Sequence, residues 1–361
     1  MKKEKTKILI VVGSRPNFIK IAPLIDELKR IDKFNYILLH TGQHYDFEMS
    51  RIFFQELKIP KPNYNLGVGS GSHAYQTAKI MERLEPIILK EKPNLIIVVG
   101  DVNSTLVGAL VAAKLNIPVG HIEAGLRSYD KTMPEEINRL LTDHISNFLF
   151  CPTKTAVNNL KKEGIKKGIY NVGDMMYDAL LENVKIAQKK SKILKKLHLK
   201  TKSYFLLTVH RASNTDNVEN LRKIITAAGE CGEKIIFPIH PRTKKQLKKL
   251  ELKIRNWKLK IIPPVGYLDM LILEKNAKKI LTDSGGVQRE AYWLKIPCIT
   301  LRKETEWVET TKDKWNILVG VDKEKIKKAI KTFNPKNEQK KYFGDGKTAK
   351  KIISILFKIY E

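Results

Sequence analysis

Short runs of β-branched and apolar residues alternate with helical patterns along almost the whole chain, and this alternation limits the fold more than any other feature. The strands predicted in the first half are residues 7–12, 36–40, 95–99, 118–122 and 148–151. Those predicted in the second half are residues 204–209, 234–239, 259–263, 279–281 and 297–301. Helices are predicted between them at residues 16–28, 72–89, 104–115, 134–146, 218–228, 243–250, 267–276 and 287–294. The pattern is typical of βαβ units and parallel sheets.

A length of 361 residues suits two α/β domains better than one. We predict two Rossmann-like, doubly wound domains at residues 1–175 and 200–345, joined through a lysine-rich stretch at residues 185–202. A C-terminal helix at residues 346–361 is expected to pack back on the first domain. Ligands of doubly wound sheets bind outside the carboxyl ends of the strands, so these ends are expected to face a shared cleft.

Charge and cysteine usage restrict the class of protein. With 67 Lys and Arg against 38 Asp and Glu, the formal net charge is +29. The excess is mostly lysine spread along the chain, without an aromatic-rich basic stripe, so we interpret it as a solvated surface and expect no nucleic-acid partner.

Cys151, Cys231 and Cys298 stand far apart, which indicates a reducing compartment. Without a signal-peptide pattern or an apolar stretch of about 20 residues, a cytoplasmic protein that does not contact a membrane is expected.

The segment after the first predicted strand suits an anion. Gly13 permits a tight turn, Pro16 suits the start of a helix, and the N–H groups of a helix N-terminus attract phosphate or carboxylate. Arg15 stands beside this terminus, and Lys20 follows it on the same helix. An ordinary turn with an exposed arginine is the alternative. The segment is not a GxGxxG fingerprint, so NAD binding has little support.

Acidic residues follow the next strands of the same domain. Asp101, after the third strand, either caps the next helix or presents a carboxylate to the cleft. Glu123 stands at the buried end of the fourth strand, where an unpaired carboxylate is costly, and is therefore a functional candidate. Glu135 lies in the first turn of the following helix, and its spacing from Arg139 also fits an ordinary surface salt bridge. The three acids are expected to converge at one edge of the sheet.

Two strands of the second domain end in histidine and arginine. The segments are His210-Arg211 and His240-Pro241-Arg242, and both suit a pyrophosphate. A lone histidine is more often structural, but two at equivalent positions favour a ligand site.

Ser284-Gly285-Gly286 is the most specific local motif. A predicted strand runs into it and a helix follows, so the glycines allow close backbone approach and the helix N-terminus can hold a phosphate. Glu290 lies one turn beyond on the same helix face, where it can accept hydrogen bonds from both ribose hydroxyls. The segment therefore predicts a nucleotide site.

Together these segments resemble the non-hydrolysing UDP-N-acetylglucosamine 2-epimerases, in order and over essentially the whole chain. The motifs are GSRPNFIK, TGQH, GDVNST, GHIEAGLR, MPEEINR, the strand-end HR, PIH, LTDSGGVQREA and YFGDGKTAKKI. The resemblance implies the two-domain fold shared with GT-B glycosyltransferases, a UDP-sugar substrate, a homodimer, and neither a metal nor a redox cofactor. It implies that UDP is held by Arg15, His210, Ser284, Gly285, Gly286 and Glu290. It further implies catalytic acids at Asp101, Glu123 and Glu135, with Lys20, Arg139, Arg211, His240 and Arg302 also binding substrate.

The chain departs from the family's pattern at several positions. Where bacterial members often read HRRE, Ala212 and Ser213 follow His210-Arg211. The missing residues are associated with an additional regulatory substrate molecule, so activation by substrate is in doubt, although Gln43 and His44 are kept. Met270 takes the aromatic position near the uracil. Trp307 falls in a segment that reads TTERPE in many members.

The reaction implied by the resemblance is reversible C2 epimerisation of UDP-N-acetylglucosamine through elimination and re-addition of UDP, with 2-acetamidoglucal between the two steps. A related branch acts on 2,3-diacetamido uronic acid sugars, so the sugar stays open. The alternatives outside this reaction are a GT-B glycosyltransferase, which needs an acceptor groove, and a UDP-sugar sensor that binds without turnover. A hydrolysing epimerase usually carries an attached kinase, for which the chain has no room.

Overall fold

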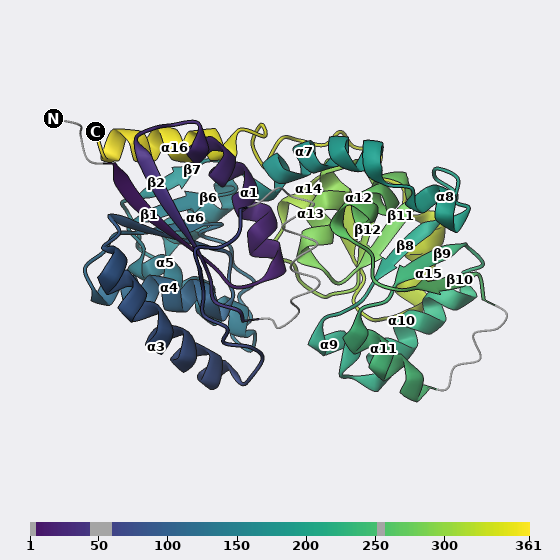
Figure 1. Cartoon of the computed structure of the whole chain (residues 1–361). Helices are drawn as coiled ribbons and strands as arrows, with labels where there is room; N and C mark the ends of the chain where they lie inside the picture. Colours follow the sequence, from purple (N-terminus) through teal and green to yellow (C-terminus); the bar gives the residue numbers. More distant parts are fainter. Residues whose placement is uncertain (1–4, 44–59, 251–256) are drawn as a thin grey trace. The chain divides into compact units, whose positions relative to one another are not determined.

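The computed structural model describes residues 5–43, 60–250 and 257–361, and it divides the chain into two compact units (Figure 1). Unit 1 comprises Met1–Leu181 and Lys341–Glu361, and unit 2 comprises Glu182–Lys340. Each unit has a parallel sheet with helices packed against it, so the predicted α/β fold class is confirmed.

The sheet of unit 1 has seven parallel strands in the order β3-β2-β1-β4-β5-β6-β7. The strands are β1 (Thr6–Val12), β2 (Phe34–His40), β3 (Tyr64–Asn65), β4 (Leu95–Val99), β5 (Val119–Ile122), β6 (Phe148–Cys151) and β7 (Ile169–Asn171). The helices are α1 (Arg15–Lys29), α3 (His73–Glu91), α4 (Asn103–Lys114), α5 (Pro134–Ile145), α6 (Lys154–Lys162) and α16 (Thr348–Ile359). Helices α3, α4 and α5 lie on one side of the sheet, and α1 and α16 pack together on the other (Figure 1).

The sheet of unit 2 has six parallel strands in the order β10-β9-β8-β11-β12-β13. The strands are β8 (Phe205–Thr208), β9 (Ile235–Pro238), β10 (Leu259–Ile262), β11 (Lys279–Thr282), β12 (Cys298–Thr300) and β13 (Asn316–Leu318). The helices are α8 (Ile193–Leu197), α9 (Ala212–Thr215), α10 (Val218–Glu230), α11 (Pro241–Leu247), α12 (Tyr267–Asn276), α13 (Gly285–Trp293), α14 (Glu309–Lys312) and α15 (Lys323–Thr332). A short 3-10 helix, Lys248–Leu250, extends α11.

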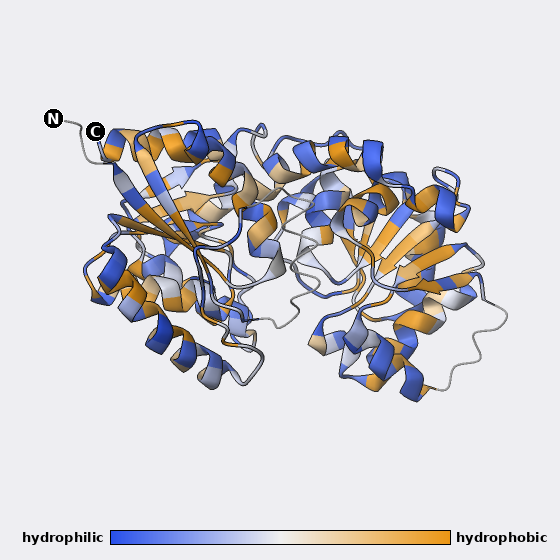
Figure 2. Cartoon of the chain, viewed as in Figure 1, coloured by the Kyte–Doolittle hydropathy of each residue, from blue (hydrophilic) through white to orange (hydrophobic). Residues whose placement is uncertain are grey.

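In each sheet the strand order reverses once. The reversal puts the carboxyl ends of β1 and β4 side by side in unit 1, and those of β8 and β11 in unit 2. In unit 1 the chain returns past β1 to form β4, and in unit 2 it returns past β8 to form β11. In open α/β sheets a crevice forms where the strand order reverses in this way. Strand β4 is buried along its full length, and Figure 2 shows the hydrophobic strands of both sheets among helices with hydrophilic outer faces.

All the predicted strands and helices are present, with ends within a few residues of the prediction. Three short edge strands, β3, β7 and β13, were not predicted, because two or three residues carry little periodicity. The lysine-rich stretch at residues 185–202, predicted as a connection between the domains, is largely helical. Helix α7 (Met175–Lys190) and helix α8 occupy most of it, so most of its lysines belong to helices.

The C-terminal segment belongs to unit 1. Helix α16 contacts α1, and the backbone carbonyl of Phe343 accepts a hydrogen bond from the Asp174 N–H at 3.0 Å. The buried Asp178 carboxylate accepts another from the Ala349 N–H at 2.9 Å. Unit 1 is therefore built from both ends of the chain. Within the described ranges, no helix is long and apolar enough to cross a membrane.

Candidate functional site

Four predicted site residues form one buried cluster in unit 1. Lys20, from α1, is paired with the carboxylate of Glu123, which follows β5. Asp101, which follows β4, accepts two hydrogen bonds from the Arg139 guanidinium of α5, at 3.0 Å from Nε and 2.6 Å from Nη2. The cluster stands at the carboxyl ends of β1, β4 and β5, where the strand order reverses.

The surroundings keep Asp101 ionised. Burial acts to raise the pKa of Asp101, but the positive charges of Arg139 and Lys20 outweigh it and the pKa is lowered. The side chain of Asp101 is still 30% exposed, so a ligand can reach it. Asp101 therefore has the charge and the access that a proton acceptor needs.

The backbone around Glu123 is held in an uncommon conformation. Glu123 has a φ of 73°, a left-handed value that side chains other than glycine seldom adopt, while its N–H and that of Ala124 both reach the carbonyl of Phe150. Gly100, at the end of β4, faces the same cluster. A Cβ at Gly100 would lie 3.3 Å from Lys20 Nζ and 3.5 Å from Glu123 Oε2. The local strain and the tight packing both fix the position of the Glu123 carboxylate.

The first turn of α5 carries two acids with different surroundings. Glu136 is buried and accepts hydrogen bonds from the backbone N–H groups of Ser128 and Tyr129, both at 2.9 Å, and from Arg139 Nη1 at 2.8 Å. Glu135, the predicted catalytic acid, is half-buried in the same turn. Since Arg139 bridges Glu136 and Asp101, the helix is tied to the acid cluster through a buried cation rather than through a surface salt bridge.

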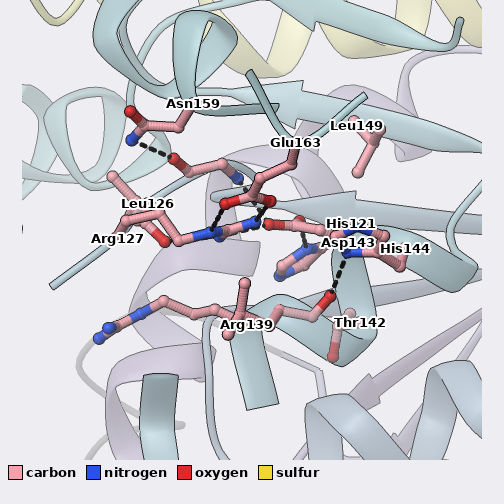
Figure 3. A network of polar contacts seen from close by, with 12 residues as sticks. His121, Leu126, Arg127, Arg139, Thr142, Asp143, His144, Leu149, Asn159 and Glu163 are labelled. Atoms are coloured by element: carbon pink, nitrogen blue, oxygen red, sulfur yellow. Dashed lines mark hydrogen bonds and ion pairs between the residues drawn. The ribbon is translucent and has the colours of Figure 1, made fainter. Parts of the chain in front are cut away.

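A second charged network lies next to the cluster, and Figure 3 shows it beside Arg139. The buried His121 ring contacts a neighbour through each of its nitrogens. Its Nδ1 lies 2.7 Å from Asp143 Oδ1, and its Nε2 lies 2.8 Å from the carbonyl oxygen of Gly100. Asp143 also accepts hydrogen bonds from Arg127 Nη1 at 2.7 Å and from the Gly125 N–H at 3.0 Å. The network thus connects the loop that follows β5 with the residue that precedes Asp101.

In unit 2, Asp283 holds the predicted histidine–arginine segment in place. Its carboxylate accepts hydrogen bonds from the backbone N–H groups of His210 and Arg211, at 3.1 Å, and from Asn214 Nδ2, also at 3.1 Å. The His210 Nδ1 is 3.0 Å from Asp283 Oδ1, while 43% of the ring is exposed. Burial favours a raised pKa for Asp283, but the contacts with His210 and Asn214 lower it. His240 caps α11, and its ring centre is 6.0 Å from that of His210.

The Ser-Gly-Gly motif forms the N-terminus of α13, as predicted. The Ser284 hydroxyl accepts a hydrogen bond from the Val287 N–H at 3.4 Å. A Cβ at Gly285 would collide with Glu306 Oε1 and lie 3.1 Å from Trp307 Nε1. A side chain at this position would therefore force the Glu306 carboxylate to move. At Gly286 a Cβ would meet only Ser284 Oγ, at 3.7 Å, so the second glycine leaves the approach to the helix terminus open.

Glu306 connects the predicted arginines to this helix terminus. It accepts a hydrogen bond from Arg302 Nη1 at 2.9 Å and lies 3.5 Å from Arg211 Nη2. Arg302 is buried, and its Nη2 has no hydrogen-bond partner among the described residues. Trp307 packs 3.7 Å from the guanidinium of Arg289. The terminus of α13 therefore has the Glu306 carboxylate beside it, together with the two arginines that contact this carboxylate.

Glu290 lies on α13 beyond the glycines but is almost fully buried. Its Oε1 accepts a hydrogen bond from the Tyr267 hydroxyl at 3.0 Å. Burial, and then the charge of Glu290, raises the pKa of Glu274 of α12 well above its usual range. At Arg15 the structure describes the backbone, which begins α1, but not the side chain.

Apart from Arg15 and Lys20, the residues of these two groups lie within the part of the chain that matches a known protein family. A family model described as UDP-N-acetylglucosamine 2-epimerase matches residues 26–357. The chain belongs to this family. Its members are isomerases, so the chain is assigned to an isomerase family.

Individual epimerases of the family match over nearly their full length. A protein of Methanococcus maripaludis named a UDP-N-acetylglucosamine 2-epimerase homolog is 61% identical, covering 97% of this chain and 99% of its own. The UDP-2,3-diacetamido-2,3-dideoxy-D-glucuronate 2-epimerase of Pseudomonas aeruginosa is 42% identical, covering 98% and 100%. The crystal structure of the Methanocaldococcus jannaschii UDP-GlcNAc 2-epimerase in complex with UDP-GlcNAc and UDP is 50% identical, with a TM-score of 0.91 over 98% and 100% of the two chains.

The structure places most of the positions at which the chain was compared with the family's pattern. Ala212 and Ser213 begin the short helix α9, and Met270 lies on α12. Gln43 is buried and accepts hydrogen bonds from the N–H and hydroxyl of Ser104, at 3.2 and 2.6 Å. His44 lies outside the described residues.

Five buried residues of the site were not predicted from the sequence: Glu136, Asp143, Glu274, Asp283 and Glu306. Each is a buried acid that holds or interacts with a predicted residue or its motif. Glu274 carries the signal that identified Glu123, namely an acid that follows an apolar run, whereas Glu136 and Glu306 stand among polar and charged residues and carry no such signal.

Proposed function

We propose that the chain catalyses the reversible C2 epimerisation of UDP-N-acetylglucosamine to UDP-N-acetylmannosamine through elimination and re-addition of UDP. The observation that carries the proposal is the cluster of Lys20, Asp101, Glu123 and Arg139, which brings two carboxylates and two cations to the sheet reversal of a chain in this family. The solved M. jannaschii relative in complex with UDP-GlcNAc and UDP supports a UDP-sugar as the substrate.

UDP binding is assigned to the strand ends of unit 2 and to Arg15. The exposed face of His210 and the helix terminus at Ser284, Gly285 and Gly286 offer donors for the pyrophosphate. Arg211, His240 and Arg302 add donors and positive charge nearby, and Glu290 accepts hydrogen bonds from the ribose. These groups stabilise the negative charge that develops on UDP as it leaves.

The chemistry at C2 is assigned to Asp101, Glu123 and Glu135. In the elimination one carboxylate takes the C2 proton, the C2–H electrons form the C1–C2 double bond, and the C1–O electrons leave with UDP. The product is 2-acetamidoglucal. Re-addition reverses these changes with protonation on the opposite face of C2. Arg139 and Lys20 lower the pKa of Asp101, which favours the ionised form of this acid before the elimination.

A second candidate substrate is the UDP-2,3-diacetamido uronic acid sugar. It is favoured by the P. aeruginosa relative, whose name specifies this sugar and which matches 98% of the chain at 42% identity. Its reaction at C2 would use the same acids. The two substrates differ at C3 and C6 of the sugar, so a direct comparison separates them.

The test is proton NMR of each UDP-sugar incubated with the protein in D₂O. We expect the C2 epimer to appear with deuterium at C2, and UDP with 2-acetamidoglucal to accumulate in weakened variants. Asp101→Asn should lower turnover by about 10²-fold or more while UDP still binds. Glu82→Gln on the exposed face of α3 serves as the matched control and should keep normal turnover. A protein that binds UDP-GlcNAc and the uronate sugar but epimerises neither would refute the proposal.

We also propose that the protein is a homodimer. Ile137 and Leu141 are 46% and 49% exposed and stand one turn apart on α5, which leaves an apolar stripe in solvent. Light scattering on the wild type and on Ile137→Asp/Leu141→Asp measures the mass directly. A monomeric wild type would contradict this proposal.

A further inference from the structure

Asp283 fixes both the orientation and one hydrogen of the His210 ring in unit 2. The Asp283 side chain has no exposed surface. Its oxygens accept hydrogen bonds from the N–H groups of His210 and Arg211 and from Asn214 Nδ2, each at 3.1 Å, and Oδ1 lies 3.0 Å from His210 Nδ1. Burial acts to raise the pKa of Asp283, but these contacts lower it, so the carboxylate is ionised. Since an ionised carboxylate has no hydrogen to give, His210 Nδ1 is the donor.

The second nitrogen of the His210 ring is the one left for a ligand. The side chain is 43% exposed, and Nδ1 is directed at the buried Asp283, so a hydrogen bond to a ligand falls to Nε2. In a neutral ring with its hydrogen on Nδ1, Nε2 can only accept. The ionised oxygens of a diphosphate also only accept. One further proton turns Nε2 into a charged donor, and charged donors form the stronger hydrogen bonds to phosphate.

His240, at the end of the neighbouring strand, has the opposite arrangement of hydrogens. Its Nδ1 accepts a hydrogen bond from the Arg242 N–H at 3.2 Å and so caps α11. A nitrogen that accepts carries no hydrogen, so the His240 ring is neutral with its hydrogen on Nε2. The Arg242 guanidinium is paired with Asp216 at 2.6 Å. The His240 ring centre is 6.0 Å from that of His210, so His240 places no second charge beside that ring.

Arg211, next to His210 in the chain, shares a carboxylate with Arg302. Glu306 accepts a hydrogen bond from Arg302 Nη1 at 2.9 Å and lies 3.5 Å from Arg211 Nη2. These three side chains together carry one net positive charge, whereas a UDP diphosphate carries more than one negative charge near neutral pH. A positive charge on His210 therefore stabilises the bound ligand further.

We propose that His210 takes up a proton on Nε2 when the diphosphate of UDP binds, with Asp283 as the positioning residue for this step. The proposal rests on the assignment of UDP to this site. The proton comes from water and returns to it when UDP leaves the protein. Asp283 holds Nδ1 as a donor and balances the charge that the ring gains, and it acts through His210 because it has no exposed surface. The charged ring then stabilises UDP after the C1–O bond breaks.

Two variants separate the proton from the hydrogen bond. His210→Gln supplies a neutral amide donor in place of Nε2 and cannot take up a proton. Asp283→Asn keeps an acceptor for the backbone N–H groups, but its amide donates to Nδ1, so the ring hydrogen moves to Nε2 and no uptake is needed. The matched control is His198→Asn, an exposed histidine after α8 whose left-handed φ of 53° asparagine tolerates.

The readout is the number of protons taken up per UDP bound. Calorimetry in buffers of different ionisation enthalpy measures it between about pH 7 and 8.5, where the phosphate of free UDP is already ionised. We expect the wild type and His198→Asn to take up as much as about one proton and to lose affinity as pH rises, by up to about tenfold per pH unit. His210→Gln and Asp283→Asn should bind UDP with little uptake and with an affinity that changes little over this range. Thermal melting checks that each variant is folded.

Nitrogen-15 NMR of the wild type gives an answer that needs no folded variant. The chain has 8 histidines, so the ring signals are few. Saturating UDP should convert one ring nitrogen from the unprotonated to the protonated form, and this signal should be missing from His210→Gln.

The outcomes distinguish this inference from the proposed function. If the wild type does not bind UDP, the UDP site and this inference both fail. If His210→Gln keeps the affinity and the proton uptake of the wild type, the assignment of His210 is wrong. If the wild type binds UDP without proton uptake and with every ring nitrogen unchanged, only the inference is refuted. If a folded Asp283→Asn variant takes up as many protons as the wild type, the role of Asp283 is refuted.

Discussion

Replacing Asp143 with asparagine should destabilise unit 1 and leave UDP binding intact. The side chains of Asp143, His121 and Arg127 are 0% exposed, so the variant removes one charge from a fully buried network. Truncating one partner of a buried ion pair costs about 3–5 kcal/mol. Arg127 keeps both of its hydrogen bonds to Glu163, at 2.7 and 2.6 Å, which favours the lower end of that range.

A loss of about 3 kcal/mol corresponds to a fall in melting temperature of about 6–12 °C for a unit of this size. Differential scanning calorimetry of the full chain measures it, and calorimetric titration with UDP checks unit 2. Glu163→Gln is the matched control, because Glu163 belongs to the same network but is 22% exposed, and it should cost about 1 kcal/mol or less. If Asp143→Asn melts within about 2 °C of the wild type, or above Glu163→Gln, the reasoning about this network is wrong.

Three other predictions follow from the site. Glu123→Gln should lower kcat by about 10²-fold or more with UDP affinity unchanged, measured by NMR turnover and calorimetry, and near-native turnover would contradict its role. Gly285→Ala should weaken UDP binding by about tenfold or more, because the added methyl group collides with Glu306 at the helix terminus; unchanged affinity would refute the assignment of the site. The pKa of Asp143 is lowered by His121 and Arg127 against the effect of burial, so its contribution to stability is present above the unfolded pKa and is lost as pH falls. The difference in melting temperature between the wild type and Asp143→Asn should therefore narrow below about pH 4, and a constant difference would count against this.

The fold could be predicted from the sequence because its main strands are buried on both faces. Strand β4 consists of five consecutive apolar residues, and the helices that follow the strands begin with recognisable turn residues such as Pro16 and Pro134. The edge strands could not be predicted in the same way. Strand β3 has two residues, and its pairing with β2 depends on contacts distant in sequence.

The site could be predicted in part. The positions of Asp101, Glu123 and Ser284 follow from the rule that ligand groups stand at the carboxyl ends of parallel strands. Which charges pair could not be predicted, since Arg139 bridges Asp101 and Glu136 only because α5 folds back toward β4.

The return of the chain to unit 1 affects the order in which the protein can fold during synthesis. When the ribosome has finished residues 1–181, α1 still lacks α16, and the carboxylate of Asp178 lacks the N–H of Ala349. About 160 further residues must be translated first, which takes roughly 8–30 s at common elongation rates. Throughout that interval the apolar face of α1 that α16 covers is open to other nascent chains and to chaperones. Unit 2 emerges complete before this face is covered, so the part of the chain that is synthesised first is the last to reach its final structure.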